Sequence, residues 1–359
     1  MRILICTHQM RDGGAERVLS LWIKGFVERG NKVSLVICTR NNQIDYPLPE
    51  VVNIFNILPQ SKGRIAAFVE RVRSLRKIIK KERPDIIITA LGPWGLWAFI
   101  ASLGIKTKII NTEHNSFERP PEAPMPLSVK FYKFYVNKLF DRVTVLTEAD
   151  KKVIGKRLRN VSVLPNPLAF EPTKSVPPKD KIVMAAGRLD SWHVKGFDVL
   201  MKAWNLFSPK YPDWRLIVAG SGTKETKDYL SGILSEQALA TVDFIGFTPN
   251  IEEFFKRSSV FVLSSRYEGF GMVLLEAMSQ GCVCVACDYK GRQKEIIVNE
   301  SMGYLCDTNS PELICENLCA ILNDSEHIKL IQENSIERAK LYSLNAIMNK
   351  WDKIITEIK

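Results

Sequence analysis

Two series of short, almost entirely apolar runs divide this chain, and a proline-rich segment lies between them. Runs of this kind, separated by helical patterns, are typical of parallel strands that helices cover on both faces of a sheet. The first series comprises residues 3–6, 33–38, 85–89, 108–111 and 142–146, and the second comprises residues 182–187, 216–220, 242–246, 260–263 and 282–286. The sequence therefore predicts an α/β protein with two Rossmann-like parallel-sheet domains.

The proline-rich segment marks the boundary between these domains. It carries five prolines within 14 residues, from Pro165 to Pro178, and such a composition disfavours both helices and strands. A chain of 359 residues also exceeds the size at which single hydrophobic cores stop growing. We expect an N-terminal domain over residues 1–168, a linker over 169–180 and a C-terminal domain over 181–342. Ligands of such sheets bind beyond the carboxyl ends of the strands, which predicts a site in a cleft between the domains.

Composition narrows the class of protein. With 46% hydrophobic and 25% charged residues the chain reads as an ordinary globular protein. No apolar run reaches the ~18–20 residues of a transmembrane helix, and Met1–Thr7 enters a strand pattern without the features of a signal peptide. The eight cysteines lie mostly in apolar segments without a repeated CxxC pattern. We therefore expect buried, reduced thiols, no metal site and a cytoplasmic location.

Net charge is distributed unevenly along the chain. Through Lys174 there are 29 Lys and Arg against 15 Asp and Glu, a net of +14, whereas the remainder has 21 against 24, a net of −3. Residues 64–83 place many cations on a helical pattern whose apolar side includes Ile65, and residues 130–138 alternate lysines with aromatics. This pattern fits either a core-facing helix with a solvated outer face or docking on an anionic membrane surface. We expect no nucleic-acid partner, because no reading motif accompanies the charge.

The strongest chemical signal lies between Glu268 and Gly281. Glu268 and Glu276 stand eight positions apart and bracket a glycine-flanked turn that opens an apolar helix. Glycines let a ligand approach the backbone, and N–H groups at a helix start bind anions such as a diphosphate. Glu276 can accept hydrogen bonds from a ribose, and Glu268 can face a second polyol. This predicts nucleotide-sugar binding at the turn formed by Gly269, Phe270 and Gly271. The N–H groups of Met272, Val273 and Leu274 are expected to face the diphosphate.

Several loops after predicted strands add further candidates. Gly13 and Gly14 open the first helix after the first strand, where a substrate can approach closely, although a simple tight turn explains them as well. Arg188 and Lys195 follow the first strand of the second series and could neutralise a departing diphosphate, or be ordinary surface cations.

Four more residues complete the set of candidates. His114 directly follows a strand, where a structural hydrogen-bonding role and a role in positioning a substrate both remain open. Gly220, Gly246 and Phe247 end strands of the second series and are either turn residues or part of a pocket for the base and ribose.

Taken together, these motifs resemble the signature of the retaining family-4 glycosyltransferases of the GT-B fold, of the type that builds bacterial surface polysaccharides, lipopolysaccharides or lipid-linked oligosaccharides. The resemblance spans nearly the whole chain, with the motifs in family order. It implies that Glu268 contacts the donor sugar and Glu276 the ribose, that Arg188 and Lys195 bind the diphosphate, and that His114 acts near the anomeric carbon. It also implies that the last helix, within residues 343–359, crosses back to the first domain.

The implied reaction is a retaining, metal-independent transfer without a cofactor. It would move a hexose or N-acetylhexosamine from a nucleotide-diphosphate sugar to a saccharide or lipid-linked acceptor. The segment from Asp288 to Ile297 most resembles relatives that use UDP-sugars, which favours UDP. We expect the enzyme in the cytoplasm or peripherally on the inner face of the cell membrane. Two alternatives remain open: a nucleotide-sugar epimerase of the same fold, and a non-catalytic module that binds nucleotide sugars or membranes.

Overall fold

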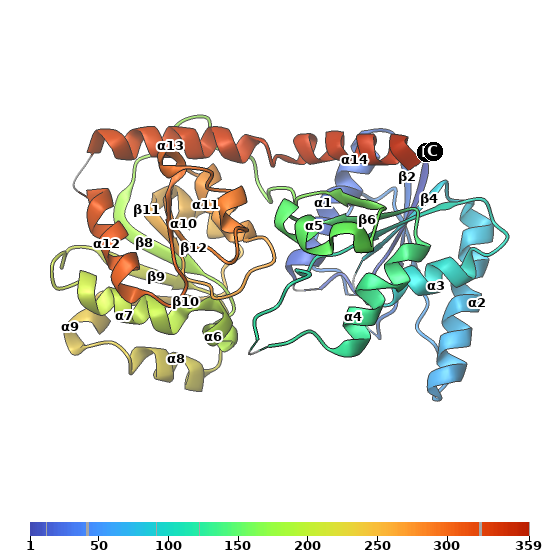
Figure 1. Ribbon diagram of the computed structural model, residues 1–359, viewed down its shortest axis with the longest axis horizontal. Helices are drawn as coiled ribbons and strands as arrows, with labels where there is room; N and C mark the ends of the chain where they lie inside the picture. Colours follow the sequence, from blue (N-terminus) through green and yellow to red (C-terminus); the bar gives the residue numbers. More distant parts are fainter. Residues whose placement is uncertain (12, 41–42, 91, 122, 323–324, 359) are drawn as a thin grey trace. The chain divides into compact units, whose positions relative to one another are not determined.

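The computed structural model describes the chain except for residues 12, 41–42, 91, 122, 323–324 and 359. The described chain divides into two compact units. Unit 1 comprises Met1–Ala169 together with Leu344–Lys359, and unit 2 comprises Phe170–Ser343. Each unit is a parallel sheet flanked by helices (Figure 1). The predicted fold class, two Rossmann-like parallel-sheet domains, is confirmed.

Within its described residues, unit 1 contains a seven-stranded parallel sheet in the order β3-β2-β1-β4-β5-β6-β7. Its strands are β1 (Arg2–Cys6), β2 (Lys32–Ile37), β3 (Asn53–Asn56), β4 (Ile86–Ala90), β5 (Lys108–Thr112), β6 (Arg142–Val145) and β7 (Val161–Val163). The order reverses between β1 and β4, which is where ligands bind in open α/β sheets, at the carboxyl ends of the strands.

The helices of unit 1 are α1 (Gly14–Glu28), α2 (Arg64–Glu82), α3 (Trp94–Ala101), α4 (Leu127–Phe134), α5 (Glu148–Ile154) and α14 (Leu344–Ile358), with short 3-10 helices η1 (Val136–Leu139) and η2 (Gly155–Arg157). One buried cluster joins the sheet to Leu75 and Ile79 of α2 and to Trp94 of α3. Ile65, however, is 82% exposed, so the prediction that it belongs to the core-facing side of α2 was wrong. Ile65 lies in the first turn of α2, and its side chain faces solvent.

The last helix, α14, belongs to the core of unit 1. Trp351 is fully buried and meets the ring of Trp22 of α1 edge-on at 5.0 Å between centroids. A Cβ on Gly25 of α1 would lie 2.6 Å from a side-chain carbon of Met348, so the two helices pack closely there. Arg29 at the end of α1 pairs with Asp352 and donates to the side chain of Asn349 at 2.7 Å. Both apolar packing and polar contacts thus hold α14 in this unit.

Within its described residues, unit 2 contains a six-stranded parallel sheet in the order β10-β9-β8-β11-β12-β13. Its strands are β8 (Asp180–Ala186), β9 (Arg215–Ala219), β10 (Val242–Gly246), β11 (Ser258–Leu263), β12 (Val283–Cys287) and β13 (Tyr304–Cys306). Its helices are α6 (Trp192–Lys195), α7 (Phe197–Phe207), α8 (Lys224–Ser231), α9 (Glu236–Leu239), α10 (Ile251–Arg257), α11 (Met272–Ser279), α12 (Pro311–Leu322) and α13 (Ser325–Lys340), with 3-10 helices η3 (Leu189–Ser191), η4 (Gln293–Glu295) and η5 (Glu300–Met302). The order reverses between β8 and β11.

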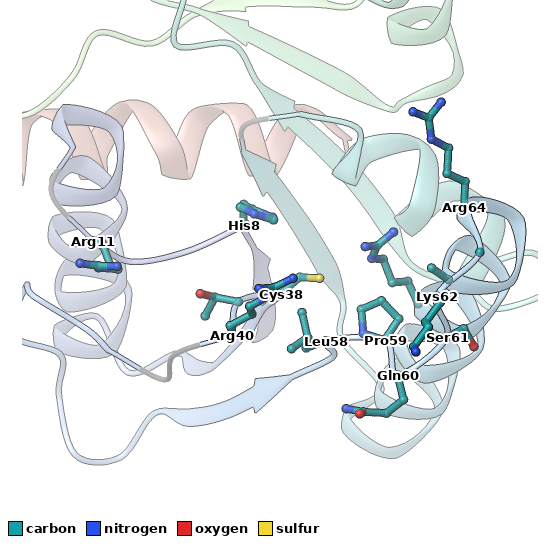
Figure 2. Close-up of a pocket in the computed structure, with 14 residues that line it drawn as sticks. His8, Arg11, Cys38, Arg40, Leu58, Pro59, Gln60, Ser61, Lys62 and Arg64 are labelled. Atoms are coloured by element: carbon teal, nitrogen blue, oxygen red, sulfur yellow. The ribbon is translucent and has the colours of Figure 1, made fainter.

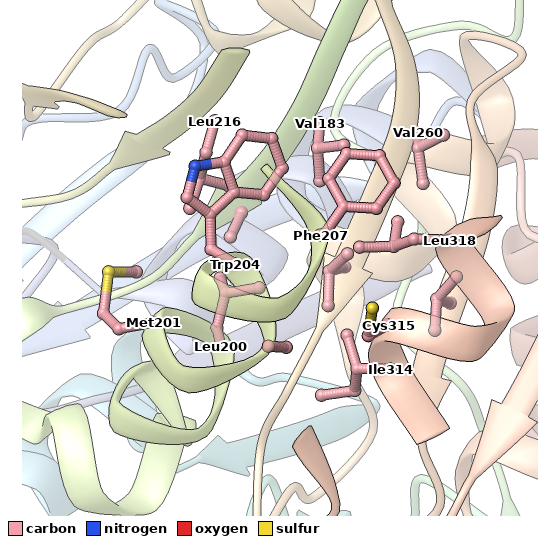
Figure 3. Close-up of a cluster of buried hydrophobic side chains, with 14 of the residues drawn as sticks. Val183, Leu200, Met201, Trp204, Phe207, Leu216, Val260, Ile314, Cys315 and Leu318 are labelled. Atoms are coloured by element: carbon pink, nitrogen blue, oxygen red, sulfur yellow. The ribbon is translucent and has the colours of Figure 1, made fainter. Parts of the chain in front are cut away.

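Alternate side chains of the unit 2 strands pack on opposite faces of the sheet. Val260 joins the large cluster formed with Trp204 and Phe207 of α7 and with α12 (Figure 3). Phe261, the next residue along β11, instead meets the ring of Phe255 of α10 at 5.6 Å. Both faces of the strand are therefore buried, which explains its continuous apolar sequence.

Two further features concern the whole chain. Among the residues that the structure describes, no helix combines the length and apolar character needed to span a lipid bilayer. All eight cysteines are free, and seven of them are buried.

Candidate functional site

The carboxyl ends of β8, β9 and β10 come together through three glycines. Gly187 donates its backbone N–H to Ala219 at 2.9 Å, and Gly220 donates to Gly246 at 2.8 Å. A Cβ on Gly220 would lie 1.7 Å from the carbonyl oxygen of Gly187, and its φ of 149° also favours glycine. Gly220 therefore allows the two strand ends to approach each other. Phe247 follows Gly246 with 76% of its surface exposed, an unusual position for an aromatic ring.

Lys195, the last residue of α6, forms an ion pair with Glu268 in the loop that follows β11. Lys195 Nζ lies 2.6 Å from Glu268 Oε1, and Ser265 Oγ donates to the same oxygen at 2.8 Å. Their side chains are 24% and 12% exposed, so the pair is sheltered but reachable from solvent. Arg188, just after β8, is exposed. The structure thus brings together Lys195 and Glu268, which the sequence placed in separate motifs.

A second set of contacts fixes these loops. Ser264 Oγ donates to the carbonyl of Lys195 at 2.9 Å, and a Cβ on Gly196 would lie 1.9 Å from the carbonyl oxygen of Ser264. Arg266 binds both carboxylate oxygens of Asp198 at 2.7 Å. Burial raises the pKa of Asp198, but the hydrogen bonds and charge of Arg266 outweigh this and hold the pKa below its usual value. Sequence reasoning missed this pair, because its partners are far apart in the chain and neither belongs to a motif.

The start of α11 offers backbone donors. Gly271 has φ 91° and ψ 53°, a left-handed conformation that favours glycine. The N–H of Leu274 donates to the Gly271 carbonyl at 3.0 Å, so the prediction that this N–H faces a ligand was wrong. Within the described part of the chain, the N–H groups of Met272 and Val273 have no backbone acceptor. These two groups, at the positive end of the helix dipole, can bind an anion.

Not every residue predicted to bind at this turn has an accessible side chain. Phe270 is buried and its ring packs against Tyr342 at 5.8 Å, and Leu274 is fully buried. Of these two residues, only Phe270 remains a candidate for ligand contact, through its backbone, because the N–H of Leu274 is already bonded to Gly271. Met272 and Val273 are half-buried, and Gly269 is too.

Glu276 lies in the second turn of α11 and is only 3% exposed. A carboxylate at such a depth needs polar partners to offset its desolvation. It is buried in unit 2, on the same helix whose first turn carries the two free N–H groups.

Gln293 is a candidate that sequence reasoning missed. Asp288 accepts the backbone N–H groups of Gly291 at 2.9 Å and of Gln293 at 3.0 Å, which shapes the loop after β12. Gln293 Oε1 accepts the N–H of Tyr289 at 2.7 Å, and this bond fixes the orientation of the side-chain amide. Nε2 is buried, has no partner among the described residues, and lies 3.7 Å from the place of a Cβ on Gly271. It is an available donor beside the start of α11.

In unit 1, Gly13 caps the start of α1. Its φ of −158° is extended backbone, so conformation does not demand glycine here. A Cβ would, however, lie 2.0 Å from Oε2 of Glu16, whereas a Cβ on Gly14 would meet nothing within 4 Å. Glu16 is buried, and burial raises the pKa of its carboxyl group. The sequence analysis assigned this helix start to a substrate. In the structure the Glu16 side chain fills the space beside Gly13, whereas the space beside Gly14 is open. Asp12, in the same motif, lies outside the described residues.

His114 follows β5 and lines a pocket of about 440 Å³. Nε2 lies 3.1 Å from the hydroxyl of Thr112, while Nδ1 has no partner among the described residues. Burial lowers the pKa of His114 to about 4; Glu113 opposes this shift and Lys133 adds to it. The ring is therefore neutral near pH 7 and is suited to hydrogen bonding rather than to carrying charge.

Lys133 holds the loop that carries His114. Its ammonium group lies 2.9 Å from Glu113 Oε2, donates to the Asn115 carbonyl at 2.7 Å and sits over the ring of Phe117 at 4.0 Å. Lys133 is buried, so it does not belong to the basic surface that the sequence pattern of residues 130–138 suggested. The pairing of Lys133 with Glu113 crosses 20 positions and leaves no local signal in the sequence.

The described residues contain no group of three or more His, Cys, Asp or Glu arranged to hold a metal ion. The chemistry available in unit 2 is instead a lysine, an exposed arginine, two helix-start N–H groups and a side-chain amide, with two carboxylates able to accept hydrogen bonds.

Two family models together match most of the chain. The model described as Glycosyltransferase Family 4 matches residues 12–171, and the one described as Glycosyl transferases group 1 matches residues 169–338. They meet at the boundary between the two units of the structure.

Individual proteins are similar over the full length. An uncharacterized glycosyltransferase of Haemophilus influenzae is 28% identical over 96% of this chain and 96% of its own. A Campylobacter jejuni GalNAc-alpha-(1->4)-GalNAc-alpha-(1->3)-diNAcBac-PP-undecaprenol alpha-1,4-N-acetyl-D-galactosaminyltransferase is 25% identical over 100% of this chain and 99% of its own. Among solved structures, Anabaena HepE in complex with UDP and glucose has a TM-score of 0.80 at 18% identity, covering 99% of this chain and 100% of that one. This chain belongs to the family-4 glycosyltransferases, with the GT-B fold, and it is a glycosyltransferase enzyme.

Proposed function

We propose that the protein transfers a hexose or N-acetylhexosamine from a nucleotide-diphosphate sugar, with retention of anomeric configuration, to a saccharide or lipid-linked saccharide in bacterial glycan assembly. The observation that carries this proposal is the sheltered ion pair of Lys195 and Glu268. Glu268 lies four residues before the start of α11, where two N–H groups have no backbone acceptor among the described residues. The pair offers an acceptor for sugar hydroxyls and a cation for phosphate within one loop system.

Each group has a chemical role in this proposal. Arg188, Lys195 and the N–H groups of Met272 and Val273 bind the diphosphate, whose negative charge grows as the glycosidic bond breaks. Glu268 accepts hydroxyl groups of the donor sugar, and Glu276 accepts those of the ribose. Gln293 Nε2 donates a hydrogen bond to the nucleotide sugar beside the start of α11. Because protein cations and backbone dipoles supply the stabilisation, the proposed transfer needs no metal ion.

The proposed donor nucleotide is UDP. Support comes from the segment from Asp288 to Ile297, from the Anabaena structure solved with UDP and glucose, and from exposed Phe247, which offers a ring for a base to stack on. The lipid-linked acceptor follows the Campylobacter jejuni relative, whose name specifies a PP-undecaprenol saccharide.

Release of nucleoside diphosphate tests the proposal. Purified protein should release UDP from UDP-sugars, and faster when a bacterial lipid extract supplies acceptor, with the same rate in excess EDTA. The product should carry the donor's anomeric configuration by NMR. Faster release from GDP-sugars would change the assigned base. Absence of release from any nucleotide sugar, with a folded protein, would overturn the proposed activity.

We further propose that unit 1 binds an anionic membrane surface through α4 and η1. Exposed apolar residues recur every four positions on this segment: Leu127, Phe131, Tyr135 and Leu139. Lys130 and Lys138 are exposed beside them. Apolar side chains flanked by lysines are typical of interfacial helices. Such a location would bring the enzyme to a lipid-linked acceptor.

Vesicle sedimentation tests this membrane contact. Wild-type protein should sediment with vesicles that contain anionic lipid and less with neutral ones, and Leu127→Ser with Phe131→Ser should reduce binding at least fivefold. Val51→Ser with Ile54→Ser, which changes exposed apolar residues elsewhere in unit 1, is the matched control. Equal binding by both double variants would exclude α4 as the contact.

A further inference from the structure

Unit 1 contains a second, larger pocket that the proposed roles above do not use. Its volume is about 860 Å³, and it lies at the carboxyl ends of β1, β2 and β3. Figure 2 shows His8 and Arg11 from the segment after β1, Cys38 and Arg40 from the segment after β2, and the stretch from Leu58 to Arg64 that leads into α2. The His114 pocket instead lies after β4 and β5, on the other side of the reversal in strand order.

The lining of this pocket is strongly cationic. None of the described residues that line it is acidic. Five of them carry a positive charge: Arg11, Arg40, Lys62, Arg64 and Arg71. No ion pair joins any of these five to a carboxylate within the described part of the chain. Five like charges around one cavity repel one another, and an anion would relieve that repulsion.

Two guanidinium groups carry unused donors inside the protein. The Nε atoms of Arg11 and Arg71 are buried and have no hydrogen-bond partner among the described residues. The guanidinium of Arg71 lies 5.1 Å from the centroid of the Trp97 ring, which limits its freedom. Buried donors without acceptors are costly, so their presence in a cavity points to a ligand that supplies acceptor oxygens.

Glu70, which directly precedes Arg71 on α2, is already bonded to the pocket wall. Its carboxylate accepts the backbone N–H groups of Gln60 and Ser61, each at 3.0 Å, and the Ser61 hydroxyl at 2.7 Å. These bonds lower the pKa of Glu70 and keep it ionised. Glu70 therefore shapes the loop instead of neutralising the arginines.

We propose that this basic pocket binds the phosphate or diphosphate group of the acceptor. Four arginines suit the ligand, because guanidinium forks bind phosphate oxygens in pairs, and the start of α2 at Gly63 adds the positive end of a helix dipole. The cavity is larger than a phosphate, which leaves room for the attached sugar. The inference rests on the proposed transferase function and adds to it the acceptor's charged group as the feature that unit 1 recognises.

Isothermal titration with inorganic diphosphate and with farnesyl diphosphate tests this site. UDP is added first at saturation, so that the proposed donor site in unit 2 does not contribute. The pocket variant combines Arg40→Gln, Lys62→Gln and Arg64→Gln, three exposed residues whose loss spares the core. The control variant combines Arg73→Gln, Lys77→Gln and Lys80→Gln, exposed cations on the same helix that do not line the pocket.

Wild type should bind both probes, and the pocket variant should bind them at least tenfold more weakly. The control should stay within about twofold, since exposed charges are screened beyond ~8 Å at 0.15 M salt. The proposal is overturned if wild type does not bind either probe, or if both variants weaken binding equally. It is also overturned if the pocket variant loses binding to anionic vesicles but not to soluble diphosphate, because the occupant would then be a membrane headgroup. Binding without any UDP release would count against the proposed transferase function alone.

Discussion

At the scale of single residues, unit 2 places its candidate groups by pairing loops that are distant in the sequence. Glu268 and Lys195 were found from local motifs, because glycines, carboxylates and cations near strand ends have a recognisable chemistry. Gln293 and the Asp198–Arg266 pair were not found, since their significance arises only when loops meet. Burial of Phe270 and Leu274 was also invisible in the motif. The sequence thus indicates which groups are candidates for ligand binding, and the fold determines which of them are accessible to a ligand.

The two carboxylates should respond differently to removal. Glu268→Ala deletes the acceptor for sugar hydroxyls and leaves Lys195 unpaired, so transfer should fall at least 100-fold while UDP still binds. Glu276→Ala should mainly weaken UDP affinity, by roughly tenfold, the effect of losing about one charged hydrogen bond. Turnover numbers and UDP titrations of both variants provide the measurement. Unchanged turnover in Glu268→Ala would refute the assignment of this site.

His114 should make stability depend on pH in a defined window. Its pKa is about 4 in the folded protein against about 6.5 in an unfolded chain, so the unfolded state binds more protons between these values. Stability is therefore fully present above pH 6.5 and declines as pH falls toward 4. Between pH 7.5 and 5 the loss from this residue is ~2 kcal/mol. Urea unfolding of wild type and His114→Gln at both pH values measures it, and an identical decline in both proteins would contradict the prediction.

At the scale of elements, the sequence predicts the central strands well and misses three of the four edge strands; the fourth edge strand, β10, was predicted. β1, β4, β8 and β11 are buried on both faces and read as continuous apolar runs. The strands β3, β7 and β13 were not predicted, because they are only three or four residues long and lack such runs. The apolar stripe of the last helix was visible in the sequence, and the structure shows what buries it, Trp22 and Phe26 of α1.

That packing predicts the role of α14 in unit 1. Trp351→Ala removes a fully buried ring between α1 and α14 and should destabilise unit 1 by ~3–5 kcal/mol, as large-to-small changes in cores do. Lys353→Ala, an exposed position on the same helix, should change stability by less than ~0.5 kcal/mol. Hydrogen exchange followed by mass spectrometry separates the units. Loss of protection should appear in the peptides of β1 and α1, and loss confined to unit 2 would contradict the assignment.

At the scale of the whole molecule, the two units have separate cores, and their proposed ligands differ. This separation predicts that each ligand stabilises its own unit. UDP at 100 times its dissociation constant should stabilise unit 2 by ~2.7 kcal/mol, because it binds the native state and not the unfolded chain. Inorganic diphosphate, with UDP already bound, should protect the loops of unit 1 around Arg40 and Lys62. Hydrogen exchange with each ligand in turn is the measurement. At the same UDP concentration Glu276→Ala, with roughly tenfold weaker affinity, should keep only ~1.4 kcal/mol of the UDP effect and all of the diphosphate effect. The pocket variant should weaken the diphosphate effect and keep the UDP effect. If UDP protected only unit 1, the assignment of the donor site to the start of α11 would be wrong.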